Sequence, residues 1–302
     1  MIFGALEAGG TKMVVAVGNE SGCILEKKSI PTTTPEETIP KIIDFFQGKG
    51  IQALGIGAFG PVDVVKNSST YGYILNTPKL AWKQFDLVGA FQKALQIPIG
   101  IDTDVNGSCL GEMTYGCAKG LQNVLYLTVG TGIGAGIAVD GKLLHGMLHP
   151  EAGHILIGKN AHDPGQSVCP YHDSCMEGLA SGPSIEARWG KKAYELVDKQ
   201  VVWELESEYL AKGIVNMILT LSPQKVILGG GVMNQTQLFP LIREKVTTLL
   251  NHYYDTKEIA DMEQYIVPAS LDGDQGIMGA IRLAELSMKR TSNHSEQGLF
   301  RE

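Results

Sequence analysis

Two histidines and two cysteines in the middle of the chain could bind a metal ion. His154, Cys169, His172 and Cys175 follow the spacing H-x14-C-x2-H-x2-C. Two thiolates and two imidazoles complete the tetrahedral shell that Zn²⁺ takes in structural sites. Because four protein ligands leave no position for water or substrate, we predict a structural zinc ion that holds the surrounding loop.

Two alternatives stand beside this prediction. His145 and His149 are four residues apart and could supply a rival pair of ligands. The segment could also be an ordinary surface loop in which cysteine and histidine occur without a metal.

A pair of aspartates lies where a short predicted strand ends, in the segment DTDVN. Asp102 and Asp104 are both candidates for a general base, since a carboxylate at the edge of a cleft can accept a proton from a hydroxyl group. The residues alone do not separate the two. The alternative is that either aspartate caps the helix that follows, which we expect at about residues 107–116.

The chain has 37 glycines, and nine of them form clusters in three segments: LEAGGTKMVVAV at 6–17, LTVGTGIGAGIAV at 127–139 and VILGGGVMN at 226–234. Tight turns with exposed N–H groups bind anions such as phosphate. None of the segments has the Walker A spacing or the dinucleotide-binding G-x-G-x-x-G before a helix. They are either glycine-rich hairpins or three loops that line one nucleotide.

The elements that would position these residues repeat. Strand, glycine turn and strand occur once near residue 10 and again near residue 132, which indicates two similar α/β domains. We place the domains at 1–117 and 118–302, with the option that the last helix packs against the first domain.

Composition excludes several classes of function. The chain has 302 residues and a formal net charge of −7, which disfavours nucleic acid and anionic membranes as partners. The sequence contains no signal peptide and no apolar run long enough to span a bilayer. Three further cysteines, Cys23, Cys109 and Cys117, are scattered singly, as is usual in a reducing compartment. We therefore expect a cytoplasmic protein.

Seven motifs, in order, resemble the ROK family of sugar kinases and repressors. They are E-A-G-G-T-K, D-T-D-V-N, G-T-G-I-G-A-G, E-A-G-H, C-x2-H-x2-C, M-E-G-L-A-S-G and V-I-L-G-G-G-V, and the resemblance runs from Gly4 to about Leu286. It implies the actin/hexokinase-like ATPase fold, with two similar α/β domains around a central cleft. It also implies phosphorylation of a hexose by ATP with Mg²⁺, and it favours His154 over the rival pair as a zinc ligand.

The resemblance assigns roles to individual positions. It makes Asp104 the base that takes the proton from the attacking hydroxyl. The positions that match the family's sugar pocket are Gly60, Asn76, Asn106, Glu151, His154 and Glu177. The positions that match its ATP site are Gly9, Gly10, Thr11, Lys12, Thr131, Gly132, Pro223, Gly229, Gly230, Gly231, Leu271, Asp272, Gly273, Asp274 and Gln275.

Two departures from the glucokinase pattern resemble the fructokinase branch. Glu7 replaces an aspartate near the phosphates, where it would orient Mg²⁺ through water, and His172 replaces a cysteine in the zinc loop. We therefore predict that D-fructose is converted to D-fructose 6-phosphate. Glucokinase and mannokinase are the alternatives. A sugar-responsive repressor is less favoured, because the first strand begins at Ile2 with no DNA-binding segment before it. Dimers are common among the family's kinases, so we expect a homodimer.

Overall fold

The computed structural model of the chain describes residues 1–298, so the last four residues of the predicted second domain lie outside the described part. The chain forms two compact units. The first comprises 1–120, 143–149 and the chain from Ser270 onward, and the second comprises 121–142 and 150–269. These ranges differ from the predicted 1–117 and 118–302, because the final helix packs against the first unit's sheet and a short internal segment also clusters there.

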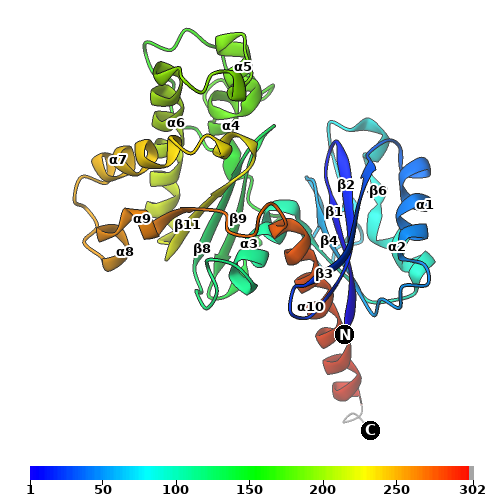
Figure 1. Cartoon of the computed structure of the whole chain (residues 1–302). Coiled ribbons are helices and arrows are strands. Elements are labelled where there is room, and N and C mark those ends of the chain that lie inside the picture. Colours follow the sequence, from blue (N-terminus) through cyan, green and yellow to red (C-terminus); the bar gives the residue numbers. More distant parts are fainter. Residues whose placement is uncertain (299–302) are drawn as a thin grey trace. The chain divides into compact units, whose positions relative to one another are not determined.

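The first unit is built on a five-stranded sheet in the order β3-β2-β1-β4-β7 (Figure 1). Strands β1, β2 and β3 are antiparallel, and β4 and β7 run parallel to β1. The strands are β1 Ile2–Ala8, β2 Lys12–Asn19, β3 Ile24–Pro31, β4 Leu54–Ala58 and β7 Ile99–Thr103. The helices are α1 Pro35–Phe46, α2 Leu87–Leu95, α3 Asp104–Thr114 and α10 Gln275–Gly298. The short strands β5 Tyr73–Ile74 and β6 Phe85–Asp86 pair separately.

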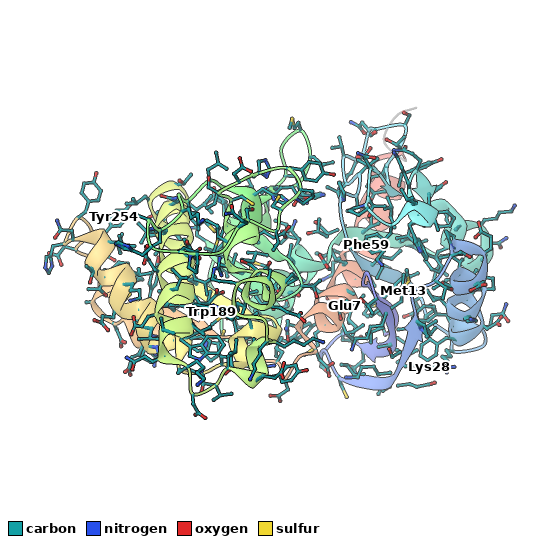
Figure 2. The ribbon with its side chains drawn as sticks, turned by 90° about the horizontal axis from the view of Figure 1, so that it is seen from above. Glu7, Met13, Lys28, Phe59, Trp189 and Tyr254 are labelled. Atoms are coloured by element: carbon teal, nitrogen blue, oxygen red, sulfur yellow. The ribbon has the colours of Figure 1, made fainter. Side chains whose placement is uncertain are left out.

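Alternation along β1 explains why this sheet is covered on both faces. Successive side chains of a strand point to opposite faces. Leu6 and Ala8 belong to the core that includes residues of α1 and α2, whereas Phe3 and Ala5 belong to a second core formed with α10. Met13 lies in the first of these cores and is labelled within that unit in Figure 2.

The second unit repeats the same strand order. Its sheet runs β10-β9-β8-β11-β12, with an antiparallel hairpin of β8 and β9 and with β11 parallel to both β8 and β12. The strands are β8 Val124–Val129, β9 Ile133–Val139, β10 Lys142–Leu143, β11 Lys225–Gly229 and β12 Ile266–Pro268. The helices are α4 Met176–Ala180, α5 Gly182–Trp189, α6 Gln200–Leu221, α7 Leu238–Leu250, α8 Lys257–Ala260 and α9 Met262–Tyr265. The internal repeat predicted from the two glycine turns is thus present in the topology.

Helix α3 begins earlier than the sequence predicts. We expected it at about residue 107, but its first residue is Asp104, because the Thr103 side chain accepts a hydrogen bond from the amide of Asn106 and caps the helix. The helix cap is therefore Thr103 and neither of the two aspartates. Among residues 1–298, no helix has the length and apolar content needed to cross a membrane.

A buried carboxyl group on α6 gives a prediction about stability. Glu206 is 1% exposed, and neither of its oxygens has a hydrogen-bond partner within the described chain. Burial raises the pKa of Glu206 well above its ordinary value, and the guanidinium of Arg188 offsets this only in part. The folded protein therefore keeps a proton that the unfolded chain releases above about pH 4.3, so Glu206 makes stability fall as pH rises from there towards the folded pKa.

We expect Glu206→Met to raise the free energy of unfolding at pH 7 by roughly 1–3 kcal/mol, because it removes a buried polar group without a partner. Urea unfolding at pH 5 and pH 7 measures this, and the gain should be larger at pH 7. Glu204→Met is the matched control, since Glu204 lies at the surface in an ion pair with Lys245. Equal stability changes in the two variants would contradict the prediction.

Candidate functional site

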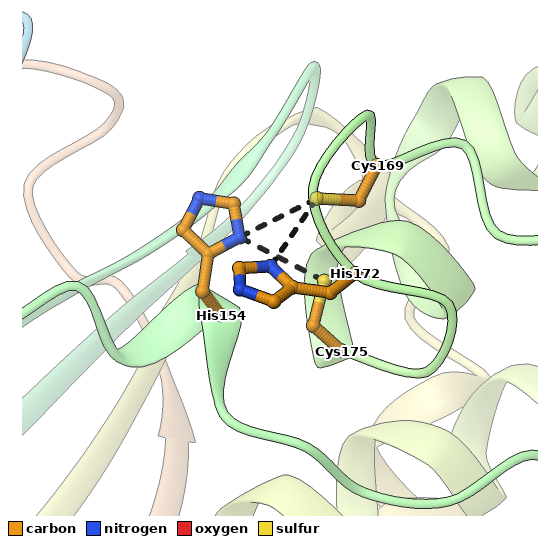
Figure 3. Close-up of side chains that lie close together, drawn as sticks. All are labelled: His154, Cys169, His172 and Cys175. Carbon is orange, nitrogen blue, oxygen red and sulfur yellow. Dashed lines mark hydrogen bonds between the residues drawn. The ribbon is translucent and has the colours of Figure 1, made fainter.

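The four predicted zinc ligands lie together in the second unit (Figure 3). One ligand atom from each residue lies within 4.8 Å of all the others. The Sγ atom of Cys169 is 3.7 Å from Nδ1 of His154 and 3.5 Å from Nδ1 of His172, and Sγ of Cys175 is 3.7 Å from Nδ1 of His154. A tetrahedral zinc with bonds of about 2.3 Å to sulfur and about 2.0 Å to nitrogen separates these atoms by about 3.6 Å. The residues therefore fit a zinc ion.

Local backbone pairing brings the ligands together. Leu156 and Cys175 form a β-bridge, so the segment after His154 runs beside the segment before α4. Cys175 is the N-cap of α4, where its Sγ accepts a hydrogen bond from the amide of Gly178. Burial raises the pKa of the Cys175 thiol to about 11, and the neighbouring Cys169 adds to this. A bound cation would favour the thiolate and so offset the effect of burial.

The rival pair of histidines is engaged elsewhere, in the first unit. Nε2 of His145 is 2.9 Å from Oδ2 of Asp102, and Nε2 of His149 accepts a 3.3 Å hydrogen bond from the amide of Val62. Neither belongs to the metal-binding cluster.

The structure separates the two candidate bases by their surroundings. Asp102 is buried, and its oxygens meet the amide of Thr103 at 2.9 Å, Nδ2 of Asn106 at 2.7 Å and His145. Asp104 is the first residue of α3 and only half-buried. The N-terminal end of a helix favours a negative charge. Asp102 therefore holds the start of α3 within a buried network, whereas Asp104 lies on the first turn, where its Oδ1 accepts a 2.9 Å hydrogen bond from the amide of Val105.

The first glycine turn joins β1 to β2. The amide of Gly9 donates to the carbonyl of Lys12 at 3.1 Å, and the hydroxyl of Thr32 donates to the carbonyl of Gly9 at 2.8 Å. Thr11 and Lys12 are exposed. Lys79 also lies at this turn, since a Cβ on Gly10 would come within 2.8 Å of its Cε. We did not predict Lys79, because an isolated lysine carries no signal in the sequence.

Glu7 lies at the end of β1 against the first turn of α10 (Figure 2). A Cβ on Gly276 would lie 2.8 Å from its Cδ. Burial raises the pKa of Glu7, and the neighbouring Asp274 raises it further, whereas Lys12 and Lys27 act in the opposite direction. The Asp274 carboxylate forms an ion pair with Lys27, whose Nζ is 2.6 Å from Oδ1 of Asp274. Oxygen ligands of this kind suit Mg²⁺.

The second and third glycine turns adjoin in the second unit. A Cβ on Gly130 would come within 3.8 Å of the amide nitrogen of Gly231. The amide of Gly182, at the start of α5, donates to the carbonyl of Gly130 at 2.8 Å. Gly230 has a φ of +90°, and a Cβ there would clash with the carbonyl of Val129. The second and third glycine turns therefore lie in direct proximity. Gly182 was not predicted, although S-G-P-S is a typical helix start.

The predicted sugar-binding residues divide between the units. Gly60, Asn76 and Asn106 belong to the first unit, and Glu151, His154 and Glu177 belong to the second. Within the second unit, Oε1 of Glu177 is 3.9 Å from Nε2 of His154.

The remaining predicted ATP-binding residues, Pro223 and Leu271–Gln275, belong to different units. Pro223 precedes β11, and its carbonyl accepts a hydrogen bond from Tyr265. Gly229 is the last residue of this five-residue strand, so the third glycine turn lies up to about 20 Å from Pro223 at about 3.3 Å per residue. Pro223 and the third glycine turn therefore lie at opposite ends of β11. Leu271–Gln275 belong to the first unit and lead into α10.

Known proteins match this chain along its whole length. The sequence model of the ROK family matches residues 3–286. A protein of Bacillus subtilis (strain 168), provisionally named a fructokinase, is 49% identical over 98% of this chain and 99% of its own. The fructokinase of Pediococcus pentosaceus is 44% identical over 96% of this chain and 99% of its own. The crystal structure of a ROK hexokinase from Thermus thermophilus superposes with a TM-score of 0.79 at 25% identity, covering 96% of this chain and all of that one.

Proposed function

We propose that this chain, which belongs to the ROK family, transfers the terminal phosphoryl group of ATP to a hexose and that D-fructose is its preferred acceptor. The observation that carries the proposal is the similarity, over nearly the full length, to proteins named fructokinase at 41–44% identity.

Asp104 is the proposed general base. A carboxylate at the start of α3 can accept the proton of the attacking hydroxyl as the bond to phosphorus forms. Asp102 holds Asn106 and the amide of Thr103 and so keeps the first turn of α3, with Asp104 in it, in one conformation. Phosphoryl transfer depends mainly on such positioning.

The glycine turns are the proposed phosphate-binding elements. Their amides offer hydrogen bonds to phosphate oxygens, and Lys12 and Lys79 add positive charge at the first turn. Glu7 and Asp274 would hold Mg²⁺ through its water ligands, and the ion would neutralise charge on the phosphates.

His154, Cys169, His172 and Cys175 would hold a structural zinc ion. The ion supplies no chemistry to phosphoryl transfer, since four protein ligands fill its shell. Its proposed work is to order the loop that carries Glu151 and Glu177 for the sugar. We also propose that the protein is a homodimer, as the resemblance to the family implies. Light scattering after gel filtration measures its molar mass.

The preference for fructose is tested with a panel of hexoses. A missing hydrogen-bond partner for a buried polar group costs about 1–3 kcal/mol, or roughly 5- to 150-fold in kcat/KM. We therefore expect kcat/KM for D-fructose to exceed that for D-glucose and D-mannose by a factor in this range. Coupled ADP release measures the rates, and ³¹P and ¹³C NMR of the product identifies position 6.

The Asp104→Asn protein, purified in the same way, gives the background from contaminating kinases. A higher kcat/KM for glucose or mannose would overturn the choice of fructose and leave the kinase assignment standing. No ADP release above background with any hexose would overturn both.

A further inference from the structure

The segment that carries the zinc ligands also holds the residue directly after the second glycine turn. We call residues 152–178 the metal loop and residues 130–132 the phosphate turn. Ile133, the first residue of β9, donates its amide hydrogen to Oε2 of Glu177 at 2.9 Å. Its carbonyl oxygen lies against Gly153, where a Cβ would clash with it. Both main-chain groups of Ile133 are therefore in contact with the metal loop.

The two contact residues stand next to metal ligands in the sequence. Gly153 directly precedes His154, and Glu177 follows Cys175 by two residues. The Sγ atom of Cys175 is 3.7 Å from Nδ1 of His154. Displacement of either ligand would therefore move a residue that touches Ile133.

The histidine provides a second connection. The thiol contacts of His154 are made by Nδ1, so a metal bound there leaves the ring proton on Nε2. Nε2 is 3.9 Å from Oε1 of Glu177, and the other oxygen of that carboxylate holds the amide of Ile133. Metal binding would thus leave the ring N–H of His154 on Nε2, the nitrogen nearer to Glu177, although 3.9 Å is too long for a direct hydrogen bond.

The carboxylate also lies directly against the phosphate turn. A Cβ on Gly132 would be 2.6 Å from Oε2 of Glu177. Beyond α4, the amide of Gly182 donates to the carbonyl of Gly130. Glu177 therefore contacts the phosphate turn at Gly132, and Gly182 contacts it at Gly130.

We propose that zinc orders the phosphate turn, and not the sugar-binding loop alone, through Glu177 and Gly153. Glu177 is in this respect a positioning residue for the nucleotide. Loss of the metal then weakens nucleotide binding even in the absence of sugar. This inference takes the identity of the ligand, a nucleoside phosphate, from the proposed function.

Hydrogen exchange tests the contact without any assay of activity. We expect amides in a peptide spanning 129–135 to exchange roughly tenfold faster in zinc-stripped than in zinc-loaded protein, as for the loss of about 1.4 kcal/mol of local protection. A peptide spanning 8–13, the equivalent turn of the first unit, should keep its rate. Unchanged exchange in 129–135 on removal of zinc would overturn the proposal.

Removal of zinc could unfold the whole chain, in which case both peptides would exchange faster. Variants of the zinc-loaded protein then test whether Glu177 and Gly153 order the phosphate turn. The probe is MgADP without sugar, measured by titration calorimetry. We expect Glu177→Ala and Gly153→Ala to raise its dissociation constant about tenfold. Glu177→Gln keeps an oxygen for the amide of Ile133 and should stay within about twofold of wild type. Leu156→Ala, an exposed position of the metal loop, is the matched control.

Wild-type affinity for MgADP in both Glu177→Ala and Gly153→Ala would overturn the proposal. A wild-type protein that binds no MgADP would instead count against the proposed kinase function, and hydrogen exchange would then decide the contact by itself.

Discussion

We expect Asp104→Asn to lower kcat for hexose phosphorylation by roughly 10²- to 10⁴-fold, the usual contribution of a general base. Asparagine preserves the shape of the side chain but cannot take the proton from the attacking hydroxyl. Hexose affinity and the fold should change little, because Asp104 is half-buried on the first turn of α3. Steady-state kinetics, calorimetric titration with the preferred hexose and circular dichroism measure the three quantities.

Two further variants separate catalysis from structure. Asp140→Asn makes the same chemical change at an exposed turn with φ of +50°, where asparagine is well tolerated, and should retain full turnover. Asp102→Asn should lose about 1–3 kcal/mol of stability, since it puts an NH2 group in place of the oxygen that faces Nε2 of His145. Near-wild-type turnover in Asp104→Asn would remove this residue from the mechanism and make Asp102 the next candidate.

The second large effect is expected at the metal cluster. Purified, unchelated protein should contain close to one zinc per chain, and Cys169→Ser or Cys175→Ser should lose most of it. Binding of a structural zinc contributes directly to folding free energy. A loss of about 2 kcal/mol or more lowers Tm by roughly 3 °C or more in a chain of this size. Plasma emission spectrometry and differential scanning calorimetry measure metal content and Tm.

Cys23→Ser is the matched control for these variants, since Cys23 is exposed and belongs to the first unit. It should keep both the zinc content and the Tm of the wild type. Absence of zinc from freshly prepared wild-type protein, or full zinc content in Cys175→Ser, would rule out this metal site.

The local features were predictable from the sequence. The strand–glycine turn–strand segments near residues 10 and 132 form the hairpins β1–β2 and β8–β9, because alternating apolar residues and glycine clusters are short-range signals. The H-x14-C-x2-H-x2-C spacing likewise identified four side chains that meet in the fold, because the chemistry of the ligands limits which residues can form such a set.

Contacts between distant segments were not predictable in the same way. Asp102 and Asp104 are alike in the sequence, and only the position of His145 and the cap at Thr103 distinguishes them. The resemblance to the family placed Pro223 with the nucleotide, and the structure shows that β11 separates it from the third glycine turn. A strand advances its chain by about 3.3 Å per residue, so closeness in the sequence does not by itself set closeness in the fold.

The sequence by itself thus determined the family, the two repeated sheets and the metal ligand set, since these depend on residue type and on spacing along the chain. The tertiary structure alone decided which carboxylate is engaged in a buried network. It alone decided that Glu177 and Gly153 hold Ile133. The physical reason is that a hydrogen bond requires its donor and acceptor within about 3 Å. Packing of the metal loop on β9 brings Glu177 and Ile133, 44 residues apart in the sequence, to that distance, and such packing leaves no pattern in the sequence.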